Sequence, residues 1–225
     1  MMLTRYGIRE WSIITAISAG AAAAAWFTGF PWAIAPVFVV WLALVAFFRD
    51  PLGRRPATSN PNDMVSPADG RVSAILDVEH HAAIGGPARI IRIFLSVLDV
   101  HVNRFPCDGT VHAIVHAEGK YLDARTAESA KVNESNVVTL KIASGECVGI
   151  RQISGAIARR IVCATSIGAR AIRGKRYGMI KFGSTTELIL PRPADVTTRV
   201  AVGDRVVGGV TILATLAAPG AQKAP

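Results

Sequence analysis

A glycine–serine step in the last quarter of the chain carries groups that could do chemistry on the chain itself. Gly183 and Ser184 lie between two strand-like runs, Met179–Phe182 and Thr186–Leu190. Glycine adopts backbone conformations that other residues avoid, and the serine hydroxyl is within reach of the carbonyl that precedes it. These groups are the minimum that a chain needs to attack its own backbone. By itself, however, Gly-Ser-Thr is more typical of a hairpin turn.

Further segments accompany this step in a fixed order along the chain. They are 47–51 (FFRDP), 66–70 (SPADG), 94–106 (FLSVLDVHVNRFP), 133–136 (NESN) and 153–160 (ISGAIARR). Together with 173–188, the series resembles the phosphatidylserine decarboxylases. The short chain and its Phe-Gly-Ser-Thr form are similar to the compact, pyruvoyl-dependent branch of that family. The resemblance covers nearly the whole sequence.

The resemblance implies an enzyme that processes itself. The chain would be cut between Gly183 and Ser184, and Ser184 would become a covalent pyruvoyl group, a pyruvate cofactor that acts as an electron sink. The matched segments give catalytic roles to His101 and Asp69. A serine hydroxyl needs a base beside it, and a carboxylate can orient the histidine that serves as that base. The expected constellation is Asp69–His101–Ser184, without a metal.

The implied reaction converts phosphatidylserine to phosphatidylethanolamine and carbon dioxide, a step of phospholipid biosynthesis. The expected partners are phosphatidylserine, membrane lipids and the chain's own fragments, 1–183 and 184–225, with no nucleic acid; a homodimer stays open. One position departs from the family pattern. Larger relatives carry two histidines three residues apart, whereas this chain has Arg104 at the second position. The role of that second histidine cannot be carried over, and we expect it to fall on His101.

Composition favours a membrane surface as the partner. The 225 residues carry a net charge of +9, which suits an anionic surface. Their mean hydropathy is positive, at +0.36, which is unusual for a protein that binds nucleic acid. The three cysteines, Cys107, Cys147 and Cys163, are widely spaced and lack a Cys-x-x-Cys pair. This spacing indicates neither a metal site nor a disulfide framework.

The apolar residues gather near the N-terminus, where 11–48 carries no charge. This stretch is nearly twice the roughly 20 residues that one membrane span needs, and the Gly-Phe-Pro sequence at 29–31 interrupts it. Arginines flank it on both sides, which favours two cytoplasmic ends. We therefore expect a helical hairpin that dips into the cell membrane from its cytoplasmic face. One long kinked span, or a helical pair buried in a soluble core, is the alternative.

The sequence pattern of the rest of the chain predicts a β-rich domain. Residues 51–63 are rich in proline and asparagine and predict a linker between a membrane-associated segment, 1–50, and a catalytic domain, 64–225. Short β-type runs follow at regular spacing. We expect a mainly β, sandwich or barrel-sandwich-like domain of the α+β class. The helical candidates are Ile157–Val162 and, beside it, the residues that flank Tyr121–Ala124.

Other functions for the chain, and structural rather than functional roles for some residues, stay open beside the enzymatic interpretation. The chain could be a membrane-anchored β-sandwich adaptor without catalysis, or a pyruvoyl decarboxylase of another amine-bearing acid. His112 and His116, four residues apart on a strand, fit a partly exposed sheet face better than a metal pair. Arg159 and Arg160 fit either a lipid phosphate or a solvated surface. Cleavage at Gly183–Ser184 separates the two classes of function, because an adaptor has no use for it.

Overall fold

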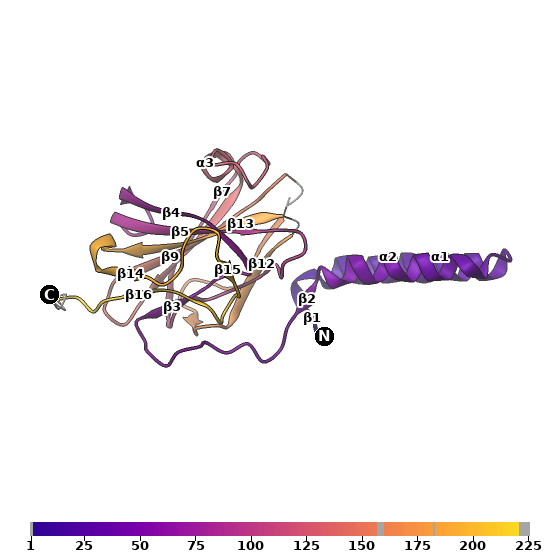
Figure 1. Cartoon of the computed structure of the whole chain (residues 1–225), viewed down its shortest axis with the longest axis horizontal. Coiled ribbons are helices and arrows are strands. Elements are labelled where there is room, and N and C mark those ends of the chain that lie inside the picture. The colour runs from indigo at the N-terminus through magenta and orange to yellow at the C-terminus, as the bar shows by residue number, and fades with distance from the viewer. Residues whose placement is uncertain (1, 157–159, 182, 221–225) are drawn as a thin grey trace. The chain divides into compact units, whose positions relative to one another are not determined.

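The structure is a computed structural model that describes residues 2–156, 160–181 and 183–220. The chain forms two compact units, Met1–Gly53 and Arg54–Pro225. The first unit is helical, and the second is built almost entirely of β-strands (Figure 1). The expectation of a mainly β protein with an N-terminal helical hairpin is therefore confirmed.

The first unit is a pair of helices, and two short paired strands join the beginning of the unit to its end. Its elements are β1 (Met2–Leu3), η1 (Arg5–Gly7), α1 (Ile8–Phe27), η2 (Pro31–Ala33), α2 (Ile34–Ala46) and β2 (Arg49–Asp50). The chain reverses at Gly29, whose φ of 79° suits glycine, and α1 and α2 lie side by side (Figure 1). The indole nitrogen of Trp41 donates to the Thr15 hydroxyl across the pair at 3.1 Å. The apolar stretch thus forms a hairpin rather than one kinked helix.

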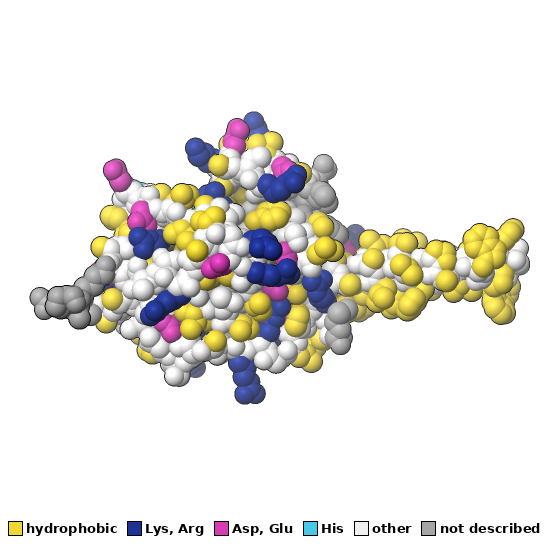
Figure 2. Space-filling view, in the orientation of Figure 1, with side chains coloured by type: hydrophobic (Ala, Val, Ile, Leu, Met, Phe, Trp, Pro, Cys, Tyr) yellow, Lys and Arg dark blue, Asp and Glu magenta, His cyan; other side chains and the backbone are white. Residues whose placement is uncertain are grey.

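The helical pair exposes apolar side chains on most of its surface. Every residue of α1 is at least partly exposed, and apolar side chains cover the unit in Figure 2. The exposed large ones include Ile13, Ile17, Trp26, Phe27, Trp32, Phe38, Val39 and Leu42. Among the helices that the structure describes, none combines the length and the hydropathy needed to cross a membrane.

The second unit contains one large sheet and two small ones. Its strands are β3 (Asp63–Val65), β4 (Gly70–His81), β5 (Gly86–Leu95), β6 (Val102–Arg104), β7 (Gly109–Ala117), β8 (Ser135–Lys141), β9 (Cys147–Ile153), β10 (Arg160–Cys163), β11 (Arg170–Ala171), β12 (Arg176–Lys181), β13 (Ser184–Pro191), β14 (Val196–Thr198), β15 (Arg205–Val206) and β16 (Ile212–Leu216). Two short helical elements, α3 (Ser129–Val132) and η3 (Pro193–Asp195), complete it.

The large sheet has eight strands, in the order β11–β7–β8–β9–β13–β5–β4–β15, and every neighbouring pair is antiparallel. β13 lies inside this order, between β9 and β5, and all eight of its residues are buried. The small sheets are β10–β12–β6 and β14–β16–β3. Because β13 begins at Ser184, the candidate cleavage step lies where the chain enters the middle of the large sheet.

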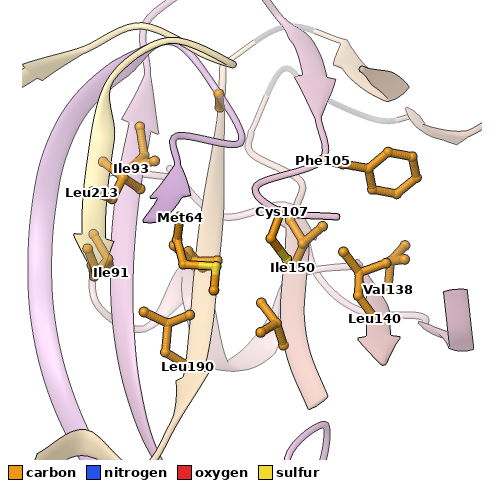
Figure 3. Close-up of a cluster of buried hydrophobic side chains, with 14 of the residues drawn as sticks. Met64, Ile91, Ile93, Phe105, Cys107, Val138, Leu140, Ile150, Leu190 and Leu213 are labelled. Atoms are coloured by element: carbon orange, nitrogen blue, oxygen red, sulfur yellow. The ribbon is translucent and has the colours of Figure 1, made fainter. Parts of the chain in front are cut away.

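The main core lies between one face of the large sheet and the small sheets. Side chains alternate along a strand, so Leu190 of β13, Ile93 of β5 and Ile150 of β9 point to the same face. Met64 and Leu213, from the β14–β16–β3 sheet, pack against them (Figure 3). This alternation matches the period-two runs from which the strands were predicted.

The predicted helix at Ile157–Val162 is wrong over its second half. Residues 157–159 lie outside the described part of the chain, but 160–162 belong to β10. Each residue of β10 pairs with one of β12, from Arg160 opposite Lys181 to Cys163 opposite Gly178. The neighbouring strand β12 decides the conformation here, and local sequence does not reveal such a partner.

The opposite face of the large sheet carries a buried ion-pair cluster. Glu187 of β13 is 1% exposed. Its carboxylate accepts a 2.8 Å bond from Arg92 Nε on β5 and lies 3.6 Å from Arg151 on β9. One negative charge thus links three adjacent strands. Removing a buried partner of such a cluster leaves the remaining charges uncompensated.

We expect Glu187→Gln to lower the free energy of unfolding by about 2 kcal/mol, the worth of a hydrogen bond between charged groups, because the partly exposed Arg92 and Arg151 would lose their counter-charge. For a chain of this size the thermal midpoint should fall by roughly 5 °C. Asp77→Asn is the matched control, since Asp77 forms a more exposed pair with Arg89 that is worth less than about 1 kcal/mol. Differential scanning fluorimetry compares the two, and equal shifts would contradict the expectation.

Candidate active site

The candidate cleavage step is a glycine in a left-handed conformation followed by a buried serine. Gly183 has a φ of 61°, which a residue with a side chain rarely adopts. Ser184 begins β13 and pairs with Leu95 of β5. Its Oγ is fully buried and has no hydrogen-bond partner within the described ranges 2–156, 160–181 and 183–220. A buried hydroxyl without a partner is costly, so its presence calls for a chemical reason.

His101 lies directly against this step. It is 0% exposed and immediately precedes β6. Its Nε2 accepts a 3.2 Å hydrogen bond from the Gly183 N–H, and its Nδ1 lies 3.0 Å from the Asp99 carbonyl oxygen. An amide N–H can only donate and a carbonyl can only accept, so the ring carries its proton on Nδ1. His101 is therefore neutral here and presents the lone pair of Nε2 to the backbone at Gly183, as a general base must.

Asp69 lies at the same end of the sheet but has other partners. Arg71 pairs with Phe94 and Ser184 with Leu95, so the segment leading into β4 and the start of β13 flank β5. The Asp69 carboxylate accepts bonds from both guanidinium nitrogens of Arg54, at 2.7 Å for Nη2, and a 2.8 Å bond from the Gly208 N–H. Among the described residues, it makes no hydrogen bond to His101. Direct orientation of the imidazole by Asp69 is thus not a feature of this structure, and its role in cleavage stays a prediction.

The group that holds the imidazole is instead the backbone of the turn before it. Asp99 Oδ2 accepts bonds from the Ser96 N–H at 2.9 Å and the Ser96 hydroxyl at 2.8 Å. Arg205 of β15 reaches Asp99 Oδ1 at 3.2 Å. The carboxylate of Asp99 therefore fixes the turn, and its carbonyl then fixes the ring of His101. Sequence reasoning missed this function, although Asp99 lies two residues before the candidate histidine.

Arg104 stands where larger relatives have a second histidine, and it faces another part of the body. Its side chain is almost fully buried, and Nη1 donates to the Gly174 carbonyl at 3.0 Å. Its backbone N–H donates to the Pro67 carbonyl at 2.9 Å. Arg104 thus ties the segment before β12 to the segment that carries Asp69.

A buried amide network lies under the start of β13. The Asn103 side chain donates to the Thr186 hydroxyl at 3.2 Å and accepts from Gln152 Nε2 at 2.9 Å. The Gln152 oxygen accepts from Asn136 at 3.2 Å. All four side chains are at least 97% buried. Because 184 and 186 share one face of β13, this network lies next to the Ser184 hydroxyl along the strand. Only the proximity of Asn103 to His101 in the sequence could have indicated it.

The remaining candidates do not form a second site. Among the described residues, no three His, Cys, Asp or Glu side chains gather in a way that could hold a metal ion. His116 faces Glu134 at 3.6 Å. Cys107, Cys147 and Cys163 are free thiols, and burial raises the pKa of Cys107 to about 12, which makes that thiol unreactive. Arg159 lies outside the described residues.

Comparisons with known proteins identify the family of the chain. The family model described as phosphatidylserine decarboxylase matches residues 42–214. The chain belongs to the phosphatidylserine decarboxylase family. It is 42% identical over 180 residues to a phosphatidylserine decarboxylase proenzyme of Symbiobacterium thermophilum, with 80% of each chain covered. It is also 42% identical over 214 residues to the proenzyme so named in Rhodopirellula baltica, covering 93% of this chain and 86% of that one. A proenzyme of Cupriavidus pinatubonensis is 39% identical over 189 residues, 84% of either chain. The match spans the candidate site and most of the body of this decarboxylase family member.

The partners of Asp69 suggest a test of how this residue acts. We expect Asp69→Asn to accumulate uncut chain, and Arg54→Gln to do so to a lesser degree, because either change loosens the segment that lies beside the cleavage step. Denaturing gel electrophoresis after timed expression measures the uncut fraction. Arg205→Gln, which loses only a bond to Asp99, serves as the milder comparison. Full cleavage in Arg54→Gln with none in Asp69→Asn would mean that Asp69 acts as a base itself.

Proposed function

We propose that this chain is the proenzyme of a pyruvoyl-dependent phosphatidylserine decarboxylase, which cuts itself between Gly183 and Ser184. The observation that carries the proposal is the pairing of Gly183 with a neutral His101, next to a buried Ser184 hydroxyl that lacks a partner among the described residues. Family membership supports the reaction: phosphatidylserine to phosphatidylethanolamine and carbon dioxide. The non-catalytic adaptor has no comparable support.

Self-cleavage needs only groups that the site contains, plus water. Ser184 Oγ forms a bond to the Gly183 carbonyl carbon while the C–N bond breaks, and the hydroxyl proton passes through a base to the new amine. The ester then loses the α-proton of Ser184 and its C–O bond. This releases a chain that ends in the Gly183 carboxylate and leaves dehydroalanine. Water then replaces nitrogen, ammonia departs, and a pyruvoyl group remains at position 184.

His101 is the base that the geometry supports best. Its Nε2 is unprotonated and lies 3.2 Å from the Gly183 nitrogen, the residue just before the nucleophile. Because the Gly183 N–H occupies Nε2, the Ser184 hydroxyl must displace that contact before it can give up its proton. The bond from Nδ1 to the Asp99 carbonyl stabilises the imidazolium that results. Ser184, His101 and Asp69 are the residues to which we assign processing.

The site also fits the prosthetic group that the family uses. When formed, the pyruvoyl carbonyl would accept electrons from a substrate amine as the carboxylate leaves. The buried position of Ser184 excludes bulk water from this carbonyl, and the Asn103–Thr186 network provides fixed polar groups beside it. His101, whose Nε2 contacts Gly183, is placed to return a proton to the group that forms at position 184.

The two fragments should remain one folded body after the cut. Fragment 184–225 begins with β13, which pairs with β5 and β9 of the other fragment. Glu187 binds Arg92 across this boundary, and Arg192 binds Glu146. The bonds from Arg192 hold the pKa of the Glu146 carboxyl below its usual range, so this contact is charged at neutral pH.

We propose that the helical pair anchors the enzyme in the cell membrane from the cytoplasmic face. The apolar side chains exposed on α1 and α2 would lose that exposure in lipid, which is favourable. The basic residues at both ends of 11–48 support a hairpin whose ends stay on one side. A lipid substrate fits this placement, since phosphatidylserine also resides in the membrane.

Mass spectrometry of the denatured protein tests the cleavage directly. Wild type should separate into a fragment ending at Gly183 and a fragment of 184–225 whose N-terminus resists Edman degradation. Ser184→Ala should stay intact and inactive. His101→Ala should accumulate uncut chain, because its rate of self-cleavage should be at least about 100-fold lower than that of wild type. A wild-type protein that is intact yet fully active would refute the mechanism. Preference for a soluble amino acid over phosphatidylserine would reassign the substrate.

Membrane extraction tests the anchor. We expect detergent to release the full chain, and high salt or alkaline carbonate to leave it bound, because salt screens charge attraction but does not reverse apolar insertion. A variant lacking the residues before Arg49 should still cut itself, as every proposed processing residue follows them. It should lose most activity on vesicles and less on dispersed short-chain substrate. Release of the full chain by salt alone would disprove insertion.

A further inference from the structure

Gly155 lies against the carbonyl group that self-cleavage would attack. β9 and β13 pair up to Ile153 opposite Thr185, and two more residues on each chain bring Gly155 opposite Gly183. A Cβ atom added to Gly155 would lie 2.2 Å from the Gly183 carbonyl oxygen and 3.2 Å from its carbonyl carbon. Real Cβ atoms do not approach a carbonyl this closely, so only glycine fits at 155 with the Gly183 carbonyl where it is.

The two glycines are required for different reasons. Gly183 has a positive φ of 61°, but among the described residues a Cβ there would meet only the side chain of Val97, at 4.0 Å. Gly155 is not among the glycines with positive φ, and its requirement is for space alone. The conformation of Gly183 therefore sets the direction of the chain, whereas the missing side chain of Gly155 sets where the Gly183 carbonyl can lie.

The backbone at Gly155 is held from its other side and cannot easily retreat. The Ser154 N–H donates to the Glu134 carbonyl at 2.9 Å, and the Asn133 side chain donates to the Ser154 carbonyl at 2.9 Å. The Cβ of Ala124 lies 3.2 Å from the position of an added methyl group. A methyl group at 155 would therefore displace the Gly183 carbonyl rather than the segment that carries Gly155.

We propose that Gly155 is a positioning residue for self-cleavage, holding the Gly183 carbonyl in line for attack by the Ser184 hydroxyl. This inference rests on the proposed function. The step it governs forms the Oγ–C bond, breaks the C–N bond and moves the hydroxyl proton to the new amine. An attack of this kind requires the reacting atoms to be aligned within about 3–3.5 Å, and a displacement of about 1 Å can cost roughly 100-fold in rate.

Gly155→Ala in the full chain tests the inference, with timed cleavage followed by denaturing gel and mass spectrometry. We expect the rate of cleavage to fall by about 100-fold or more. Gly149→Ala is the first control: it lies on β9 opposite β13, but the three atoms nearest its Cβ belong to the side chains of Ile189 and Ala83 rather than to backbone. Gly109→Ala is the second, because its Cβ would lie 2.7 Å from the Lys141 carbonyl, away from the cleavage step. Both controls should cleave within about threefold of wild type.

Two further readouts separate positioning from loss of structure. Hydroxylamine cuts the ester that follows attack, so Gly155→Ala should yield no hydroxylamine-dependent fragment if the attack itself is blocked. The residual rate should keep the pH midpoint of wild type, since the base is unchanged. A hydroxylamine-sensitive ester in Gly155→Ala, or cleavage at the wild-type rate, would overturn the inference.

A folding defect would be recognised by the thermal midpoint. If Gly155→Ala melts well below Gly109→Ala, the double variant Ala124→Gly with Gly155→Ala removes the secondary contact and keeps the clash with Gly183. That variant should fold and remain uncut. Cleavage in it would also overturn the inference. An uncut wild type would instead reject the proposed function, so the two failures are distinguishable.

Discussion

The hydrogen-bond pairing of β13 between β5 and β9 is the constraint on which the site depends. A strand with neighbours on both sides has its register fixed by two ladders at once, so Ser184 has only one place to begin. That register brings Gly183 to His101 and to Gly155. The catalytic geometry is thus a property of the sheet rather than of a flexible loop, which suits a reaction that must occur once in every molecule.

Backbone groups orient the candidate base directly, and charged side chains act on it only indirectly. The imidazole of His101 is oriented by a carbonyl and an amide, both of which have fixed hydrogen-bonding roles. The carboxylates nearby act a step away: Asp99 fixes a turn, and Asp69 joins Arg54 and Gly208. Both contacts suit the neutral ring with its proton on Nδ1, the form that leaves Nε2 free of a proton.

The sequence predicted those features of the fold and the site that depend on local patterns and motifs. The alternating runs predicted most strands, the uncharged block predicted the helical hairpin, and the family resemblance indicated Ser184 and His101. The sequence did not reveal what depends on distant partners. The sequence of β10 predicts a helix, but pairing with β12 makes it a strand. The sequence suggests Asp69 as the partner of His101, but its carboxylate binds Arg54. Nothing in the local sequence marks Gly155, which the register of β9 and β13 places against Gly183. These contacts join residues 15 to 28 positions apart, beyond the reach of periodicity.

The inward position of β13 also changes the thermodynamics of the protein once it is cut. Before cleavage, refolding joins strands of one chain and proceeds independently of concentration. After cleavage, the strand that fills the gap between β9 and β5 belongs to a separate molecule. Unfolding then becomes a dissociation, and the apparent stability falls as the protein is diluted, as for any obligate complex. The mature form would therefore persist mainly by the slowness of its opening, while the precursor alone can recover readily from denaturation.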